Sequence, residues 1–198
     1  MKGDLKTLLD FVKFTHEIRE VTRTIHFEHD KRQENDMEHG YQLALVAWFL
    51  IENDKLPLDK FRCVGMALVH DTIEVYSGDV SAHLPGAYHP SRKKNEALAA
   101  AKLKKRWPNF KSLHDLVDEY EALQTPEAVF VYALDKLIPI INIYLYGGRS
   151  WHLMDISLDD LKRIKVGKVD ISAEINKYYQ EFLKILERQP ELFGKVEK

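Results

Sequence analysis

Apolar residues recur at helical spacing along almost the whole chain of 198 residues, whereas the alternating pattern typical of strands is scarce. Capping residues, glycines and prolines divide this pattern into segments of helical length. Thr125-Pro126, for example, is an N-cap residue followed by proline at the first helical position. The predicted helices cover about 5–21, 37–52, 59–77 and 91–107, with further helices from 112, 126, 157 and 172. We therefore expect an all-α fold, a compact single-domain bundle of seven or eight helices spanning 1–198.

Charge and cysteine content narrow the class of protein. The net charge of −2 argues against a nucleic-acid partner or a membrane surface. The single cysteine, Cys63, excludes an internal disulfide, and its helical position predicts a buried core thiol. The longest apolar run, Leu43–Ile51, is too short to span a bilayer, and no signal-peptide core follows the N-terminus. A cytoplasmic protein is expected.

One apolar segment, Val64–Val69, ends in an unusual concentration of ionisable groups. The next ten residues, 70–79, hold one imidazole and three carboxylates, in His70, Asp71, Glu74 and Asp79. The pair His-Asp also occurs at 29–30, in a polar run, and at 114–115, where Ser112 and Asp115 match a capping box. Only the pair at 70–71 leaves an apolar segment, where charge is costly unless it is paired or bound to metal. This segment is the candidate site.

Two other helices offer side chains that could complete a metal site. His39 begins the apolar face of the helix over 37–52, and Asp135 lies in the apolar sequence 129–138. A core histidine and an ion-paired aspartate are the structural alternatives for these two residues. His70 and Asp71 are adjacent, so both reach one ion only at a helix end or on a concave surface. Two histidines and two carboxylates would suit Mn, Fe, Co, Ni or Zn.

The order His39, His70-Asp71, Asp135 resembles the HD-domain metal-dependent phosphohydrolases. The patterns E-H at 38–39 and H-D-x-x-E-V-x-x-G-D at 70–79 are similar to the branch that contains the 5′-deoxynucleotidases. The resemblance covers about 5–150, so it implies a catalytic helical core there, with the helices of 151–198 packed on it. It also implies a homodimer as a possible assembly.

The resemblance implies roles residue by residue. His39, His70, Asp71 and Asp135 would hold one divalent transition-metal ion, and Glu74 and Asp79 would act on water or the leaving group. Arg23 matches a phosphate-binding arginine, and Lys136 is a second candidate for neutralising the phosphate. The implied reaction releases phosphate from (deoxy)nucleoside 5′-monophosphates.

Two departures from the family pattern concern the choice of substrate. Thr24 stands where relatives often carry a tryptophan that excludes a ribose hydroxyl, and Gly40 stands where serine is common. Alternative functions are therefore an HD phosphohydrolase acting on another nucleotide, such as a di- or triphosphate, a pyrophosphate or a signalling nucleotide. A non-catalytic helical binding module with a structural metal is the non-enzyme alternative.

Overall fold

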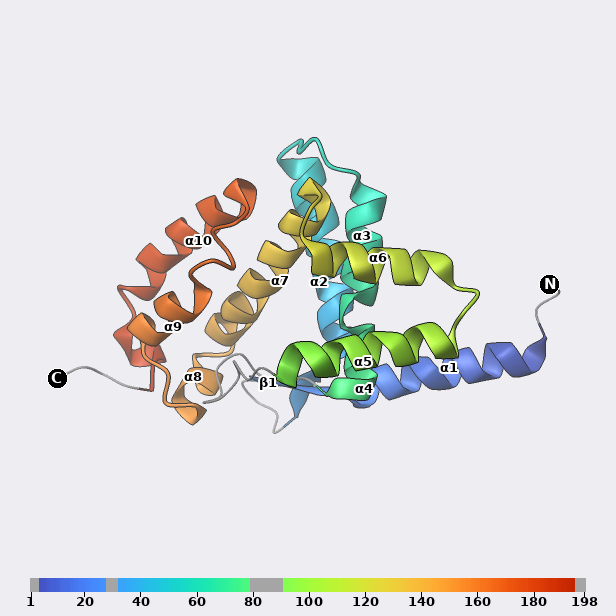
Figure 1. Cartoon of the computed structure of the whole chain (residues 1–198). Coiled ribbons are helices and arrows are strands. Elements are labelled where there is room, and N and C mark those ends of the chain that lie inside the picture. The colour runs from blue at the N-terminus through green and yellow to red at the C-terminus, as the bar shows by residue number, and fades with distance from the viewer. Residues whose placement is uncertain (1–3, 28–31, 79–90, 195–198) are drawn as a thin grey trace.

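A computed structural model describes residues 4–27, 32–78 and 91–194 of the chain (Figure 1). The all-α fold class is confirmed, with one small sheet in addition. The elements in chain order are α1 (Leu5–Glu20), β1 (Thr22–His26), β2 (Gln33–Asn35), α2 (Asp36–Asn53), α3 (Lys60–Val69), the 3-10 turn η1 (His70–Ile73), α4 (Glu74–Ser77), α5 (Ser91–Arg106), α6 (Lys111–Ala122), α7 (Pro126–Leu145), α8 (Arg149–Leu153), α9 (Leu158–Lys165), α10 (Ala173–Leu186) and the 3-10 turn η2 (Pro190–Leu192).

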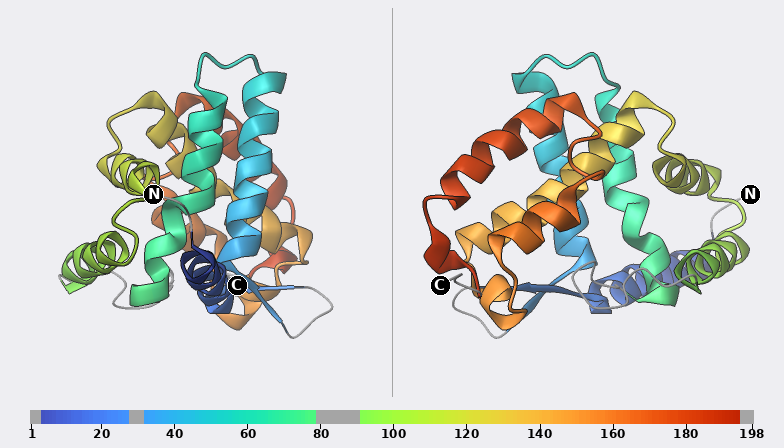
Figure 2. Two further views of the ribbon diagram at one scale, coloured as in Figure 1. Left: turned by 90° about the vertical axis from the view of Figure 1, so that its right-hand side faces the viewer. Right: turned by 60° about the vertical axis from the view of Figure 1, so that its left-hand side comes forward.

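Three helices form the centre of the bundle. α2 and α3 run side by side, and α7 packs against both (Figure 2). α6 covers α3 and α7 on one side, and α10 packs on α7 on the other. The structure has more helices than the predicted seven or eight because the segment 59–77 divides into α3, η1 and α4, and because the short α8 was not predicted.

Most predicted helix starts are confirmed by their caps. The side chains of Asp4, Asp59, Thr125, Ser157 and Ser172 each accept a hydrogen bond from the first turn of the helix that follows. These bonds satisfy amide groups that have no partner within the helix.

The capping box predicted for Ser112 and Asp115 is wrong. α6 begins at Lys111, and its N-cap residue, Phe110, makes no side-chain capping bond. Ser112 therefore lies inside the helix, too late to cap it. The ring of Phe110 packs beside that of Phe11, with 5.8 Å between the ring centres, so an apolar contact lies at the start of α6.

Residues 33–35, which lie in a polar stretch between two predicted helices, form one strand of a short antiparallel sheet. β1 pairs with β2, with Thr22 opposite Asn35 and His26 opposite Gln33. β2 is only three residues long, so it shows no alternating pattern that sequence analysis could detect. The sheet brings Arg23 on β1 next to Glu34 on β2, whose carboxylate is buried.

The main core joins the central helices to the C-terminal ones. Leu43, Phe130, Trp151 and Ile175 belong to one cluster of buried residues. The apolar face of α10 is thus used within the core. Cys63 is fully buried, as predicted, and burial raises the pKa of its thiol to about 12.

α7 is the longest and most apolar of the described helices. By length and composition alone it could cross a membrane, but 61% of its apolar stretch is buried within the protein. It also carries Asp135 and Lys136 near its middle. These features match a central core helix that presents polar groups to a site inside the bundle.

Candidate metal centre

The end of α3 presents His70 and Asp71 together. The helix starts from the Asp59 cap and stops at Val69, and the backbone tightens into the 3-10 turn η1 at His70. Adjacent side chains of a regular helix point about 100° apart, so the change from α3 to η1 affects whether His70 and Asp71 can face the same point. The pair therefore lies where α3 ends, which is one of the two placements, a helix end or a concave surface, that would let both side chains reach one ion.

His39 and Asp135 approach the same point from two other helices. His39 lies in the first turns of α2, whose start is fixed by a capping box between Asn35 and Glu38. Asp135 projects from the middle of α7. The side chains of His39, His70 and Asp135 are all almost fully buried.

These three residues, called here the His/Asp cluster, converge closely. Nε2 of His39 lies 2.8 Å from Oδ1 of Asp135, and Nε2 of His70 lies 3.7 Å from the same oxygen. One ligand atom from each of the three lies within 4.8 Å of the others. The arrangement is one in which a single ion could contact all three side chains.

A second group, called here the acidic cluster, adjoins the first. One carboxylate oxygen each from Asp36, Asp71 and Glu74 lies within 4.8 Å of the others. Oδ2 of Asp71 is also 3.0 Å from Nε2 of His70. Asp71 therefore connects the two clusters, and Glu74 lies with the acids instead of sharing the His/Asp cluster.

Arg23 reaches into the acidic cluster from β1. Its guanidinium lies 2.7 Å from Asp71, 3.2 Å from Asp36 and 3.5 Å from Glu34. Its side chain keeps 13% exposure. A cation held beside a proposed metal ligand suits the phosphate-binding role that the sequence predicted.

The other predicted cation, Lys136, touches Asp135. Its Nζ lies 2.6 Å from Oδ2 of Asp135 and 5.0 Å from the centre of the Tyr132 ring. The side chain is 32% exposed, more open to solvent than Arg23. Lys136 is thus placed at the border of the site, where an anionic group could reach it.

The electrostatics of the two histidines differ. Burial lowers the pKa of His39 to about 4, so this ring is neutral at physiological pH. Burial also acts to lower the pKa of His70, but the carboxylates of Asp71 and Asp135 outweigh it and raise the pKa to about 10. His70 is therefore protonated in the absence of another cation. The site as a whole favours positive charge at Nε2 of His70.

The carboxylates show the complementary effect. Burial alone would raise the pKa of Asp135, but Lys136 and the two histidines hold it well below its usual range. His70 and Arg23 likewise overcome burial and hold the pKa of Asp71 low. Both groups are anionic and ready to bind a cation.

The side chains present fit a divalent metal ion. Nε2 of His70 is buried and has no hydrogen-bond partner of good geometry among the described residues. Two imidazole nitrogens and two carboxylate oxygens form a donor set typical of divalent transition metals. The contacts of Nε2 of His70 with the carboxylates of Asp71, at 3.0 Å, and Asp135, at 3.7 Å, are ion pairs, and a metal ion could take the place of the proton on this nitrogen.

Three site residues were not predicted from the sequence. Glu34 and Asp36, both 3% exposed, occur in a stretch whose polar composition resembles a loop. The hydroxyl of Tyr120 donates to Oδ2 of Asp135 at 2.7 Å, and only its place on the apolar face of its helix hinted at burial. Asp79, predicted to be catalytic, lies outside the described residues.

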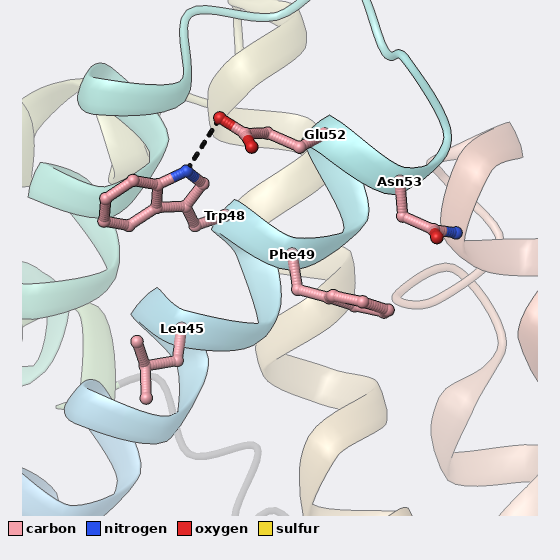
Figure 3. Close-up of a pocket in the computed structure, with 5 residues that line it drawn as sticks. All are labelled: Leu45, Trp48, Phe49, Glu52 and Asn53. Atoms are coloured by element: carbon pink, nitrogen blue, oxygen red, sulfur yellow. Dashed lines mark hydrogen bonds between the residues drawn. The ribbon is translucent and has the colours of Figure 1, made fainter.

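A pocket on the outward side of α2 contains none of the predicted site residues (Figure 3). It is lined by Leu45, Trp48, Phe49, Glu52 and Asn53, and Nε1 of Trp48 donates to Glu52 at 3.0 Å. Trp48 is 41% exposed and Phe49 is 62% exposed, whereas His39 on the same helix is buried. The pocket and the metal centre therefore use different sides of α2.

Comparisons with known proteins identify the family of this chain. The model of the HD domain family matches residues 15–176. The 5′-deoxynucleotidase HDDC2 of Homo sapiens is 32% identical over 146 residues, covering 71% of this chain and 69% of that protein. The Xenopus laevis 5′-deoxynucleotidase HDDC2 is 35% identical over 144 residues, covering 71% of this chain and 70% of its own length.

A solved structure shows the same fold over nearly the whole chain. The crystal structure of a predicted metal-dependent phosphohydrolase from Magnetospirillum magnetotacticum MS-1 matches with a TM-score of 0.79 at 24% identity. The match covers 96% of this chain and 98% of that chain. With the family match and the HDDC2 relatives, it establishes that this chain belongs to the HD-domain family.

Proposed function

We propose that the chain is a metal-dependent phosphohydrolase that releases phosphate from (deoxy)nucleoside 5′-monophosphates. The observation that carries the proposal is the convergence of His39, His70 and Asp135 from three helices, with Asp71 linking them to Arg23. The relatives named 5′-deoxynucleotidase support the substrate class.

The proposed metal ligands are His39, His70, Asp71 and Asp135. An ion bound there would lower the pKa of a bound water and polarise a phosphoryl oxygen. The nitrogen and oxygen donors suit Mn, Fe, Co, Ni or Zn, and Cys63 lies in the core as a protonated thiol.

The remaining residues would bind the substrate and move protons. Arg23 pairs with Asp71 and Lys136 pairs with Asp135, so both cations lie beside proposed ligands and could neutralise a bound phosphate. Glu74, within the acidic cluster, would exchange a proton with water or with the leaving alkoxide. Asp79 is proposed as its partner from the sequence pattern alone.

Gly40 is explained by packing. A Cβ at this position would lie 3.2 Å from the carbonyl oxygen of Ala67, so glycine lets α2 approach α3 closely. Gly40 therefore serves helix packing, and the choice between deoxyribose and ribose would depend on residues beside Arg23, of which Thr24 on β1 comes next in the chain.

The test is a phosphate-release assay on protein depleted of metal and reloaded with single ions. Nucleoside 5′-monophosphates, both deoxy and ribo, should release orthophosphate only after reloading, and nucleoside triphosphates should release neither orthophosphate nor pyrophosphate at a comparable rate. Activity in fully depleted protein would reject the metal-dependent reaction. Release of pyrophosphate as the main product would favour the alternative nucleotide substrates.

We further propose a cytoplasmic homodimer with no membrane partner. The exposed side of α2, with Tyr41, Leu45, Trp48 and Phe49, joins Phe61 at the start of α3 in an apolar surface. Such surfaces are typical of protein interfaces.

Light scattering coupled to size exclusion should give twice the chain mass, and Trp48→Glu should give the monomer mass. A monomer for the unaltered protein would contradict the proposal.

A further inference from the structure

The two histidines of the His/Asp cluster differ in the hydrogen-bond partner of the ring nitrogen Nδ1. Nδ1 of His70 lies 3.0 Å from the carbonyl oxygen of Ala67, which can accept a hydrogen bond from the Nδ1–H group. Nδ1 of His39 is buried and has no hydrogen-bond partner among the described residues. A carboxylate oxygen, Oε2 of Glu34, lies 3.9 Å from this nitrogen.

The Glu34 oxygen is also unsatisfied. Oε2 of Glu34 is buried and makes no hydrogen bond to any residue that the structure describes. The side chains of His39 and Glu34 are 0% and 4% exposed, so water does not reach them freely. A carboxylate oxygen without a hydrogen bond thus faces a ring nitrogen without a hydrogen bond, at a distance longer than a hydrogen bond.

The chemistry of metal binding supplies a reason for this arrangement. An imidazole that binds a metal through Nε2 carries its proton on Nδ1, and that N–H usually donates to a carboxylate or a carbonyl. Without a metal, Nε2 of His39 hydrogen-bonds Asp135 at 2.8 Å. When Nε2 is used for a metal, the proton on Nδ1 requires an acceptor, and Oε2 of Glu34 is in place.

The rest of the Glu34 carboxylate is held by the two helices that carry ligands. Its Oε1 accepts from Nδ2 of Asn142 on α7 at 2.9 Å. Asn142 and Gln42 on α2 form a reciprocal amide pair with hydrogen bonds of 2.9 and 2.7 Å. The anchored Oε1 leaves Oε2 directed between His39 and Arg23, whose Nε lies 3.5 Å away.

We propose that Glu34 is a positioning residue whose Oε2 accepts a hydrogen bond from the Nδ1–H group of metal-bound His39 and so orients this ring for metal binding. The inference rests on the proposed metal site. The distance of 3.9 Å between Nδ1 of His39 and Oε2 of Glu34 must shorten by about 1 Å to make a normal hydrogen bond. Through Arg23, the same carboxylate joins the metal ligand to the proposed phosphate-binding group.

Glu34→Gln separates positioning from packing. The amide oxygen can keep the bond from Asn142, but the amide nitrogen then faces the His39 Nδ1–H group, donor against donor. We expect binding of Co²⁺ to weaken by about 10- to 100-fold, the usual effect of losing such a partner. The visible spectrum of the bound Co²⁺ should also change, while the melting temperature of the metal-free protein stays close to that of the unaltered chain.

Glu17→Gln is the matched control, because it makes the same side-chain change at a glutamate that also pairs with an arginine, Arg106, on α5. Its Co²⁺ affinity and spectrum should be unchanged. If Glu34→Gln binds Co²⁺ with the affinity and spectrum of the control, the positioning role is rejected, whatever the activity. If the unaltered protein binds Co²⁺ but releases no phosphate, the proposed function fails while the role of Glu34 in metal binding stands.

Discussion

At the scale of single residues, Asp71 occupies the central position of the site. It touches His70 at 3.0 Å and Arg23 at 2.7 Å, and it is also a member of the acidic cluster. The same carboxylate would therefore serve the metal and hold the phosphate-binding arginine. Its neighbours keep its pKa low, so it remains ionised.

Asp71→Ala should abolish both metal retention and phosphatase activity. Removing the carboxylate deletes one proposed ligand and leaves Arg23 without its shortest ion pair. Metal analysis after dialysis and a phosphate-release assay measure the two effects. Asp118→Ala, which removes an exposed carboxylate paired with Lys104, is the control and should change neither. Full activity of Asp71→Ala with the metal gone would reject the mechanism.

Glu74→Ala should keep the metal and lose turnover. Glu74 groups with Asp36 and Asp71, whereas His39, His70 and Asp135 form the other cluster. Loss of a group that transfers a proton typically costs about 10²- to 10⁴-fold in rate. Metal content per chain and kcat are the measurements. Loss of the metal together with the activity would make Glu74 a ligand instead.

Metal binding should release a proton and strengthen as the pH rises. The carboxylates raise the pKa of His70 to about 10, above its usual 6.5, so the metal-free ring is protonated at neutral pH. A metal needs the neutral ring, so the proton competes with it below a pH of about 10. Calorimetry in buffers of different ionisation enthalpy between about pH 6 and 8 counts the protons released. Binding without proton release would show that His70 stays protonated or does not bind the ion.

At the scale of elements, the C-terminal end of α3 and the short sheet bring polar side chains to the site, where they meet those of α2 and α7. The sequence pattern predicted one helix over 59–77 with His70 and Asp71 inside it, whereas the structure ends α3 at Val69 and continues as the turn η1 from His70. This break supplies the helix end that two adjacent side chains need in order to reach one ion. The pairing of β1 with β2 was not predicted, because Glu34 and its neighbours look polar in sequence and are buried only by tertiary contacts. Local patterns reveal which residues can bind an ion, but not which polar residues from other segments surround them.

The close approach of α2 and α3 links packing to the site. A Cβ at Gly40 would press on the carbonyl oxygen of Ala67, which also lies 3.0 Å from Nδ1 of His70. Gly40→Ala should therefore lower both the free energy of unfolding and the metal affinity, despite the better helix propensity of alanine. Urea unfolding and Co²⁺ titration measure the two quantities.

Gly65→Ala on α3 is the matched control for this change. A Cβ there would meet the tip of the Leu116 side chain at 2.9 Å, which can rotate away, whereas the Ala67 carbonyl is part of the helix backbone. Gly65→Ala should keep the metal affinity and be the more stable of the two variants. Equal stability and equal affinity for both would show that the contact at Gly40 does not support the site.

At the scale of the whole molecule, the C-terminal helices are part of the same core as the central ones. Trp151 is fully buried and stacks on Phe193, with 4.6 Å between the ring centres. Ile175 and Leu186 are fully buried as well. The fold class and most helix starts could be predicted because capping and helical periodicity are local. The packing of the C-terminal helices on the core was expected only from the family resemblance, since an apolar helix face does not by itself indicate what covers it.

A chain ending at residue 150 should lose cooperative unfolding. Truncation would expose the apolar surface of α7 that α10 covers, and α7 carries Asp135. Thermal melts followed by circular dichroism compare the truncated and full chains. A cooperative melt at the temperature of the full chain would show that 5–150 folds independently.

The central claim is that one metal ion is held by His39, His70, Asp71 and Asp135. Anomalous diffraction from crystals of the Co²⁺-loaded protein locates the ion directly. We predict one strong peak per chain, bounded by Nε2 of both histidines and by the carboxylates of Asp71 and Asp135. A peak confined to the acidic cluster of Asp36, Asp71 and Glu74 would contradict the account, as would no peak at these residues in fully loaded protein.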